Sequence, residues 1–134
     1  MKSVTMRTIK FRAKSLCKGE DWVYGDLVHY NRNPHTEKWT IHEPDTGIGT
    51  DIDETTIGQY TGLTDRYEKE IYEGDIIEAE GIRTNVRKIV KFEEDRGCWI
   101  ACRTNGSSPD FDLCEFCGIS EIRGNIHDNT ELLK

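Results

Sequence analysis

Short runs of alternating apolar and polar residues, separated by turn residues, restrict the fold of this chain more than any other feature of its sequence. The segments 8–13 (TIKFRA), 39–43 (WTIHE) and 86–92 (VRKIVKF) alternate with a period of two, the period of side chains along a β-strand. Gly, Asp, Asn and Pro gather between such segments, and no long stretch has the 3.6-residue period of an amphipathic helix. The pattern therefore predicts an all-β (mainly β) chain.

The order of these segments predicts two β subdomains. Residues 6–62 are expected to form an N-terminal β meander, packed on a small, SH3-like β-barrel of residues 63–134. The barrel prediction rests on five strand-like segments between residues 71 and 126. Residues 1–5 are predicted to be an N-terminal extension, and Asn129 is predicted to cap a short C-terminal helix.

A Tyr, Gly-Asp, aliphatic pattern occurs twice, as VYGDLV (23–28) and within IYEGDII (71–77). Glycine permits a positive φ, and aspartate accepts hydrogen bonds from backbone N–H groups in turns. Both copies are therefore predicted to be corners at which a strand changes direction.

The net charge of −7 is concentrated in the middle of the chain. Between Glu43 and Glu80 there are twelve Asp or Glu residues and two basic residues, so this segment carries −10 and the remainder +3. Such a segment does not neutralise a phosphate backbone, because that requires cations. It is expected to form a solubilising acidic surface, a face for a basic partner or a mimic of nucleic-acid charge.

The chain has 134 residues and no apolar run near the roughly 20 residues that span a bilayer. Its first residues, MKSVT, lack the pattern of a signal peptide. We therefore expect a location in the cytoplasm and no membrane partner.

The five cysteines pose the question of a metal site. Cys114 and Cys117 have ligand-like spacing, but Cys98 and Cys102 lie on a predicted strand about 13 Å apart and do not share one zinc ion. A zinc site would combine Cys114 and Cys117 with one of the other two and with a further ligand such as His127. The favoured interpretation is that the cysteines are small, buried, reduced side chains, with no metal and no cofactor.

Five motifs resemble the YopX family of phage and prophage proteins. They are IKFRAK (9–14), WVYGDLV (22–28), DETTIGQYTGLTD (53–65), KEIYEGDII (69–77) and EIRGNIHDNTELL (121–133). The resemblance spans residues 6–133, and residues 53–77 are its most specific part. It implies a β-rich fold and an accessory role in a phage, and it implies no known reaction.

The chain departs from the family pattern in two places. Family members often have an Asn-Gly turn where this chain has Tyr67 and Glu68, so the turn here is expected to differ in type and to expose the tyrosine. The cysteines at 98, 102, 114 and 117 also fall outside the pattern.

The sequence lacks the motifs of the common enzyme classes. There is no P-loop, GxGxxG, HExxH or GxSxG motif. Asp51, Asp53 and Glu54 have carboxylates for a hard cation, but a helix cap or solvated turn explains them better. We therefore expect a protein that is not an enzyme and has no catalytic residues.

The predicted function is that of a protein-interaction module, encoded by a phage or prophage, that engages a host or phage protein through exposed aromatic residues and its acidic face. Pairing of unprotected strand edges into a homo-oligomer is a further expectation. The candidate binding residues are Tyr60, Tyr67, Tyr72 and Asp75.

Two alternatives remain open at the level of sequence. The first is nucleic-acid binding by a basic hairpin, residues 83–91, with Arg83, Arg87, Lys88 and Lys91 and a nearby aromatic Trp99. The second is a structural zinc protein built on Cys114 and Cys117.

Overall fold

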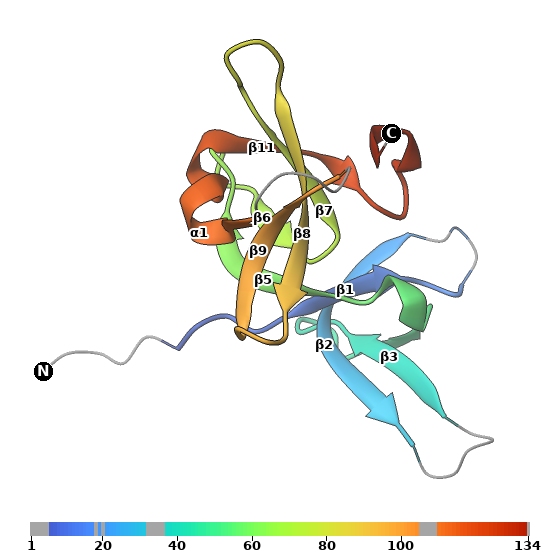
Figure 1. Cartoon of the computed structure of the whole chain (residues 1–134). Helices are drawn as coiled ribbons and strands as arrows, with labels where there is room; N and C mark the ends of the chain where they lie inside the picture. Colours follow the sequence, from blue (N-terminus) through green and yellow to red (C-terminus); the bar gives the residue numbers. More distant parts are fainter. Residues whose placement is uncertain (1–5, 18, 20, 32–36, 105–109, 134) are drawn as a thin grey trace, which may run out of the picture. The chain divides into compact units, whose positions relative to one another are not determined.

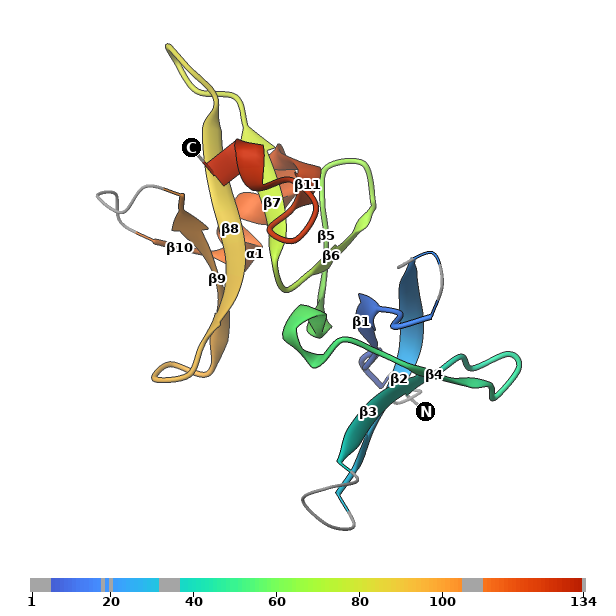
Figure 2. The same cartoon turned by 90° about the vertical axis from the view of Figure 1, so that its right-hand side faces the viewer.

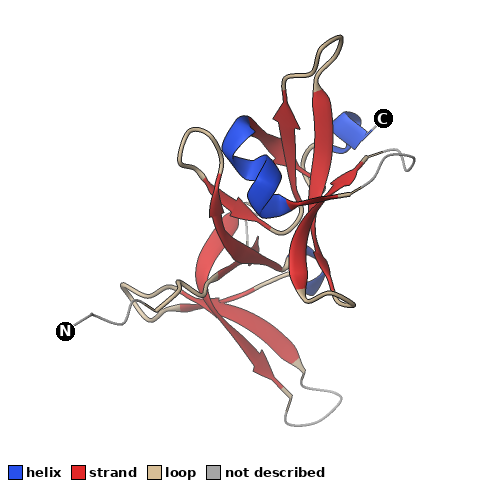
Figure 3. Cartoon of the chain, turned by 60° about the vertical axis from the view of Figure 1, so that its left-hand side comes forward, coloured by secondary structure: helices blue, strands red, loops and turns tan. Residues whose placement is uncertain are grey.

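The computed structural model describes residues 6–17, 19, 21–31, 37–104 and 110–133 (Figure 1). The predicted extension, residues 1–5, lies outside the described residues. The chain forms two compact units, residues 1–60 and 61–134, whereas the predicted division lay between residues 62 and 63. Strands dominate both units, and the α-helix of the described chain has only four residues (Figure 3). The all-β prediction is thus confirmed.

The first unit is built on an antiparallel sheet with the strand order β4-β3-β2-β1-β5. A 3₁₀ turn, η1, precedes β5, and β5 continues into the second unit. The elements are β1 (Phe11–Lys14), β2 (Trp22–Tyr30), β3 (Lys38–His42), β4 (Gly49–Asp51), η1 (Glu54–Thr56) and β5 (Gly58–Thr64).

A small hydrophobic core stabilises the first unit. Ala13 and Ile41 are fully buried and pack with Ile52. Trp39 packs against this cluster from the same face of β3 as Ile41, as the alternation of that segment predicts. Asp53 caps η1 by accepting a hydrogen bond from the Thr55 N–H at 3.0 Å, which confirms the cap interpretation of this carboxylate.

Gly25 lies where β2 changes its main pairing partner. Residues up to Gly25 pair with β1, and residues from Asp26 onward pair with β3. The φ of Gly25 is +155°, and a Cβ atom there would overlap the carbonyl oxygen of His42 on β3. The first Gly-Asp pair is therefore a point of close backbone approach inside a continuous strand rather than a turn.

The second unit contains a five-stranded antiparallel sheet with the order β10-β9-β8-β7-β11, and β6 is a neighbour of β5 (Figures 1 and 2). Helical turns connect β10 to β11 and follow β11. The elements are β6 (Glu70–Tyr72), β7 (Asp75–Ala79), β8 (Val86–Glu93), β9 (Cys98–Arg103), β10 (Phe111–Asp112), α1 (Leu113–Phe116), η2 (Cys117–Ile119), β11 (Ser120–Asn125) and η3 (Thr130–Leu133).

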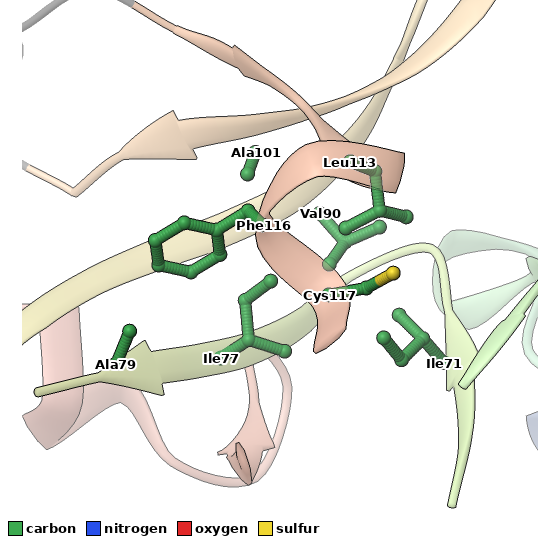
Figure 4. Close-up of a cluster of buried hydrophobic side chains, with 8 residues drawn as sticks. All are labelled: Ile71, Ile77, Ala79, Val90, Ala101, Leu113, Phe116 and Cys117. Atoms are coloured by element: carbon green, nitrogen blue, oxygen red, sulfur yellow. The ribbon is translucent and has the colours of Figure 1, made fainter. Parts of the chain in front are cut away.

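The predicted SH3-like barrel is not confirmed. In the part of the chain that the structure describes, the five-stranded sheet has open edges at β10 and β11, and no closed barrel is found. The physical reason is that residues 113–119, between these edge strands, form helical turns and not a strand. Leu113, Phe116 and Cys117 from these turns pack on Ile77 and Val90 of the sheet and complete its core (Figure 4).

The second Gly-Asp pair is a tight corner between β6 and β7. Gly74 has a φ of +90°, and the Asp75 carboxylate accepts a hydrogen bond from the Tyr72 N–H at 2.8 Å. This is the turn that the sequence predicts.

A short C-terminal helical turn follows Asn129, as predicted, but it is a 3₁₀ turn of residues 130–133. The Leu132 N–H donates to the Asn129 carbonyl at 3.0 Å, and the Asn129 side-chain oxygen accepts from the Asn125 N–H at 3.1 Å. Among the helices of the described residues, none has the length and apolar character needed to cross a bilayer.

Candidate functional site

The four predicted binding residues occupy different environments. Tyr72 and Asp75 are only 3% and 2% exposed, so they belong to the corner described above and not to a surface. Their burial was missed because an aromatic residue beside a turn has the same local pattern whether it faces the core or the solvent. Whether any of the four residues binds a partner stays a prediction.

Tyr60 and Tyr67 fall in different units. In the first unit, the ammonium group of Lys10 lies 5.2 Å from the centre of the half-buried Tyr60 ring. In the second unit, Tyr67 is 55% exposed, and the Arg66 guanidinium lies 4.9 Å from the centre of its ring. The expected exposure of Tyr67 is therefore found.

The buried carboxylate of Asp65 holds the turn that presents Tyr67. One oxygen accepts hydrogen bonds from the N–H groups of Tyr67 (2.8 Å) and Lys69 (3.0 Å). The other oxygen accepts from the Ile122 N–H of β11 at 3.1 Å. Glu68 adopts a φ of +64°, so a non-glycine residue occupies the left-handed position of this turn.

A groove lies beside this turn on the second unit. One part is a hollow of about 310 Å³, and the adjoining part, of about 410 Å³, shares Ala79, Glu80 and Ile119 with it. We call the combined feature the α1 groove. It is lined by Arg66, Ala79, Glu80, Val86, Phe111, Glu115, Phe116, Gly118 and Ile119.

The α1 groove has an apolar floor and a charged rim. Phe111 and Ile119 are 42% and 62% exposed, which is unusual for large apolar side chains so close together. Glu80 and Glu115 contribute exposed carboxylates, and Arg66 lies in the part that adjoins the Tyr67 turn. Sequence reasoning missed this site because the groove combines β7, β8, β10 and the helical turns, which no local pattern brings together.

Lys88 lies fully buried against the aromatic wall of the α1 groove. Its ammonium nitrogen is 4.7 Å from the centre of the Phe111 ring and 6.0 Å from that of Phe116. Burial lowers the pKa of Lys88, the nearby charge of Arg103 lowers it further, and Asp110 opposes this effect. Lys88 was predicted to be part of a basic surface stripe, and this prediction is wrong.

The rest of the predicted basic hairpin does not form a continuous stripe. Arg87 points to the opposite face of β8 from Lys88, where it donates hydrogen bonds to Glu78 (3.0 Å) and to the Leu132 carbonyl (3.0 Å). Arg83 and Lys91 are exposed. Successive side chains of a strand alternate between its faces, so Lys88 lies on the opposite face from Arg87 and Lys91, and Arg83 precedes the strand.

The cysteines do not gather into a metal-binding group within the described residues, where no cluster of three potential ligands occurs. Cys114 is exposed and Cys117 is buried. Burial raises the pKa of the Cys117 thiol, as it does for Cys102. The CxxC segment lies in α1 and η2, where Cys117 contributes to the core.

The fold and the groove define a small, mainly β protein of two antiparallel units, one of which carries an apolar groove with carboxylates at its rim. The chain belongs to the YopX family, because the family model for the YopX protein matches residues 10–134. The sequence resemblance is thereby confirmed.

The fold is similar to that of solved structures. One of them is the crystal structure of protein EF1440 from Enterococcus faecalis. The match covers 96% of this chain and 100% of the EF1440 chain, with a TM-score of 0.57 and 20% sequence identity. At this identity the similarity concerns the fold alone. No curated protein matches the chain.

Proposed function

We propose that this protein is a non-enzymatic protein-interaction module, encoded by a phage or prophage and acting in the cytoplasm of the bacterial host. Its partner is a host or phage protein, and the docking site is the α1 groove. The observation that carries the proposal is that the exposed Phe111 and Ile119 both line a hollow of about 310 Å³. Exposed apolar side chains around a concave site are typical of protein-binding surfaces.

The charges at the rim favour one kind of partner. Glu80 and Glu115 flank the apolar floor, so a segment with an apolar anchor next to Lys or Arg complements the groove. The acidic stretch of the sequence between residues 43 and 80 would attract the same kind of segment. Tyr67 and Arg66, at the adjoining end, extend the proposed surface toward the residue predicted from the sequence.

The nucleic-acid alternative has less support. Of its four cations, Lys88 is buried and Arg87 is engaged by Glu78, so two remain for phosphate contacts. The zinc alternative relies on Cys117, whose sulfur is part of a hydrophobic core. We therefore retain the interaction module as the function to test.

A matched pair of exposed isoleucines tests the proposal. Ile119 in the groove and Ile48 in the first unit are both 62% exposed, so Ile119→Arg and Ile48→Arg are equivalent surface changes in different places. Tagged wild-type protein and both variants are used to capture partners from lysate of a host bacterium, with and without nuclease treatment. The proposal predicts a protein bound by wild type and Ile48→Arg and lost with Ile119→Arg. Equal capture by all three, or loss of all partners with nuclease treatment, would refute it.

A further inference from the structure

The amine of Lys88 is a buried, ionisable group to which no carboxylate of the described residues is hydrogen-bonded, although the charge of Asp110 acts on it from a distance. The residue has no exposed surface, and its nitrogen has no hydrogen-bond acceptor among the described residues. Cation–π contact with Phe111 offsets part of the lost hydration, but an ammonium in an apolar site gains most from a carboxylate.

The position of this amine connects it to the α1 groove. In the sheet, Lys88 lies between Ile77 of β7 and Arg103 of β9, on the face that carries the core. Val86, two residues earlier on the same face, lines the groove, and so do both rings that the amine contacts. The Lys88 nitrogen therefore lies directly behind the aromatic wall of the groove.

We propose that Lys88 is the carboxylate subsite of the α1 groove and binds the C-terminal carboxylate of a partner protein whose last side chain is apolar. This inference rests on the function proposed above and specifies the part of the partner that docks. The apolar side chain occupies the hollow of about 310 Å³. The residues before it pass Glu80 and Glu115, which favour Lys or Arg at those positions.

Access to the amine requires a rotation of the Phe111 side chain. Phe111 belongs to the two-residue edge strand β10, is 42% exposed and is not part of the buried core cluster, so we expect a change of its rotamer to open the wall without breaking the core. The ligand carboxylate then takes the place of the ring beside Lys88, and an ion pair replaces the cation–π contact.

A peptide C-terminus fits the site better than a fatty acid of the same charge. Both ligands offer a carboxylate and an apolar group. Only the peptide also carries side chains that complement Glu80 and Glu115, whose carboxylates would otherwise lie near the anionic end of the ligand.

Two matched peptide pools test this inference. Both contain N-acetylated random hexapeptides, and they differ only in ending with a free carboxylate or with an amide. Each pool is incubated with immobilised wild type, Lys88→Met and Lys91→Met, and bound peptides are quantified and sequenced by mass spectrometry. Met preserves the length of the side chain without its charge, and Lys91 is an exposed lysine of the same strand. Circular dichroism verifies that each variant is folded.

We expect wild type and Lys91→Met to retain carboxylate peptides about tenfold over amide peptides, with apolar last residues and basic residues before them. Lys88→Met is expected to lose this discrimination and still bind amide peptides. Equal retention of both pools by wild type, or unchanged discrimination in Lys88→Met, would overturn the subsite alone. Retention of neither pool would overturn both the subsite and the proposed groove function. Displacement of bound peptides by dodecanoate at lower concentration than by the acid peptides would identify a fatty-acid site instead.

Discussion

Removal of the Asp65 carboxylate is expected to destabilise the second unit strongly, although the residue lies in a surface turn. Its two oxygens accept three backbone hydrogen bonds at 2.8, 3.0 and 3.1 Å, and the residue is 4% exposed. A hydrogen bond to a charged acceptor contributes about 1.5–3 kcal/mol. In Asp65→Ala the N–H groups of Tyr67 and Lys69 regain water, because both residues are exposed, whereas the Ile122 N–H in β11 is partly buried. The expected loss is therefore about 3 kcal/mol rather than the sum of three bonds.

Urea unfolding of the second unit measures this loss. Trp99 is the tryptophan of that unit, so its fluorescence reports on the second unit in a Trp22→Phe, Trp39→Phe background. For a unit of this size, 3 kcal/mol corresponds to about 15 °C in melting temperature. The control is Asp95→Ala in the exposed β8–β9 turn, expected within about 0.5 kcal/mol of the parent. A loss below about 1 kcal/mol, or equal losses in both variants, would show that the Asp65 bonds do not hold the turn.

Three further changes have expected outcomes. Glu68→Gly is expected to raise the free energy of unfolding by up to about 1 kcal/mol, because Glu68 has a φ of +64°, and Glu68→Ala, which keeps a Cβ, should give no such gain. Gly25→Ala is expected to cost more than about 2 kcal/mol in the first unit, since its Cβ would overlap the His42 carbonyl, whereas Gly47→Ala, at φ +70° in open space, should cost about 1 kcal/mol. Lys88→Met is expected to stabilise the second unit by about 1–3 kcal/mol at pH 7. Because folding lowers the pKa of Lys88 from its ordinary value of 10.5, wild type gains stability as the pH rises toward 10.5, so urea titrations should show this difference shrinking with pH.

The strands were predictable because the alternation of apolar and polar residues within each segment indicates which side chains face a core. Trp39 and Ile41 alternate with polar residues and face the core of the first unit. Val86 and Val90 share one face of β8 and face the core of the second unit. The helical turns were missed because α1 has four residues, too few to display a 3.6-residue period. Without those turns, strand counting favoured a closed barrel, whereas residues 113–119 cover one face of an open sheet.

The candidate site was less predictable than the fold, because its residues are distant in sequence. Exposure of Tyr67 could be inferred from a charged turn, but burial of Tyr72 depends on how β6 and β7 meet the sheet. The groove requires Val86 and Phe111 to line the same hollow, and this arrangement depends on the pairing of β8, β9 and β10. A period-two pattern assigns each side chain to one face of its strand, but it does not determine which other element packs against that face.

Lys88 shows how a residue can be placed correctly by periodicity and still be misinterpreted. The alternation of β8 puts it on the same face as Val86 and Val90, which is the buried face, but its charge suggested a surface stripe. Contact with Phe111 contributes about 2 kcal/mol, whereas burial of an ion costs several kcal/mol. Stability alone would therefore favour an apolar residue at this position. A lysine there is best explained by binding, since a ligand carboxylate meets a cation whose hydration was already lost during folding.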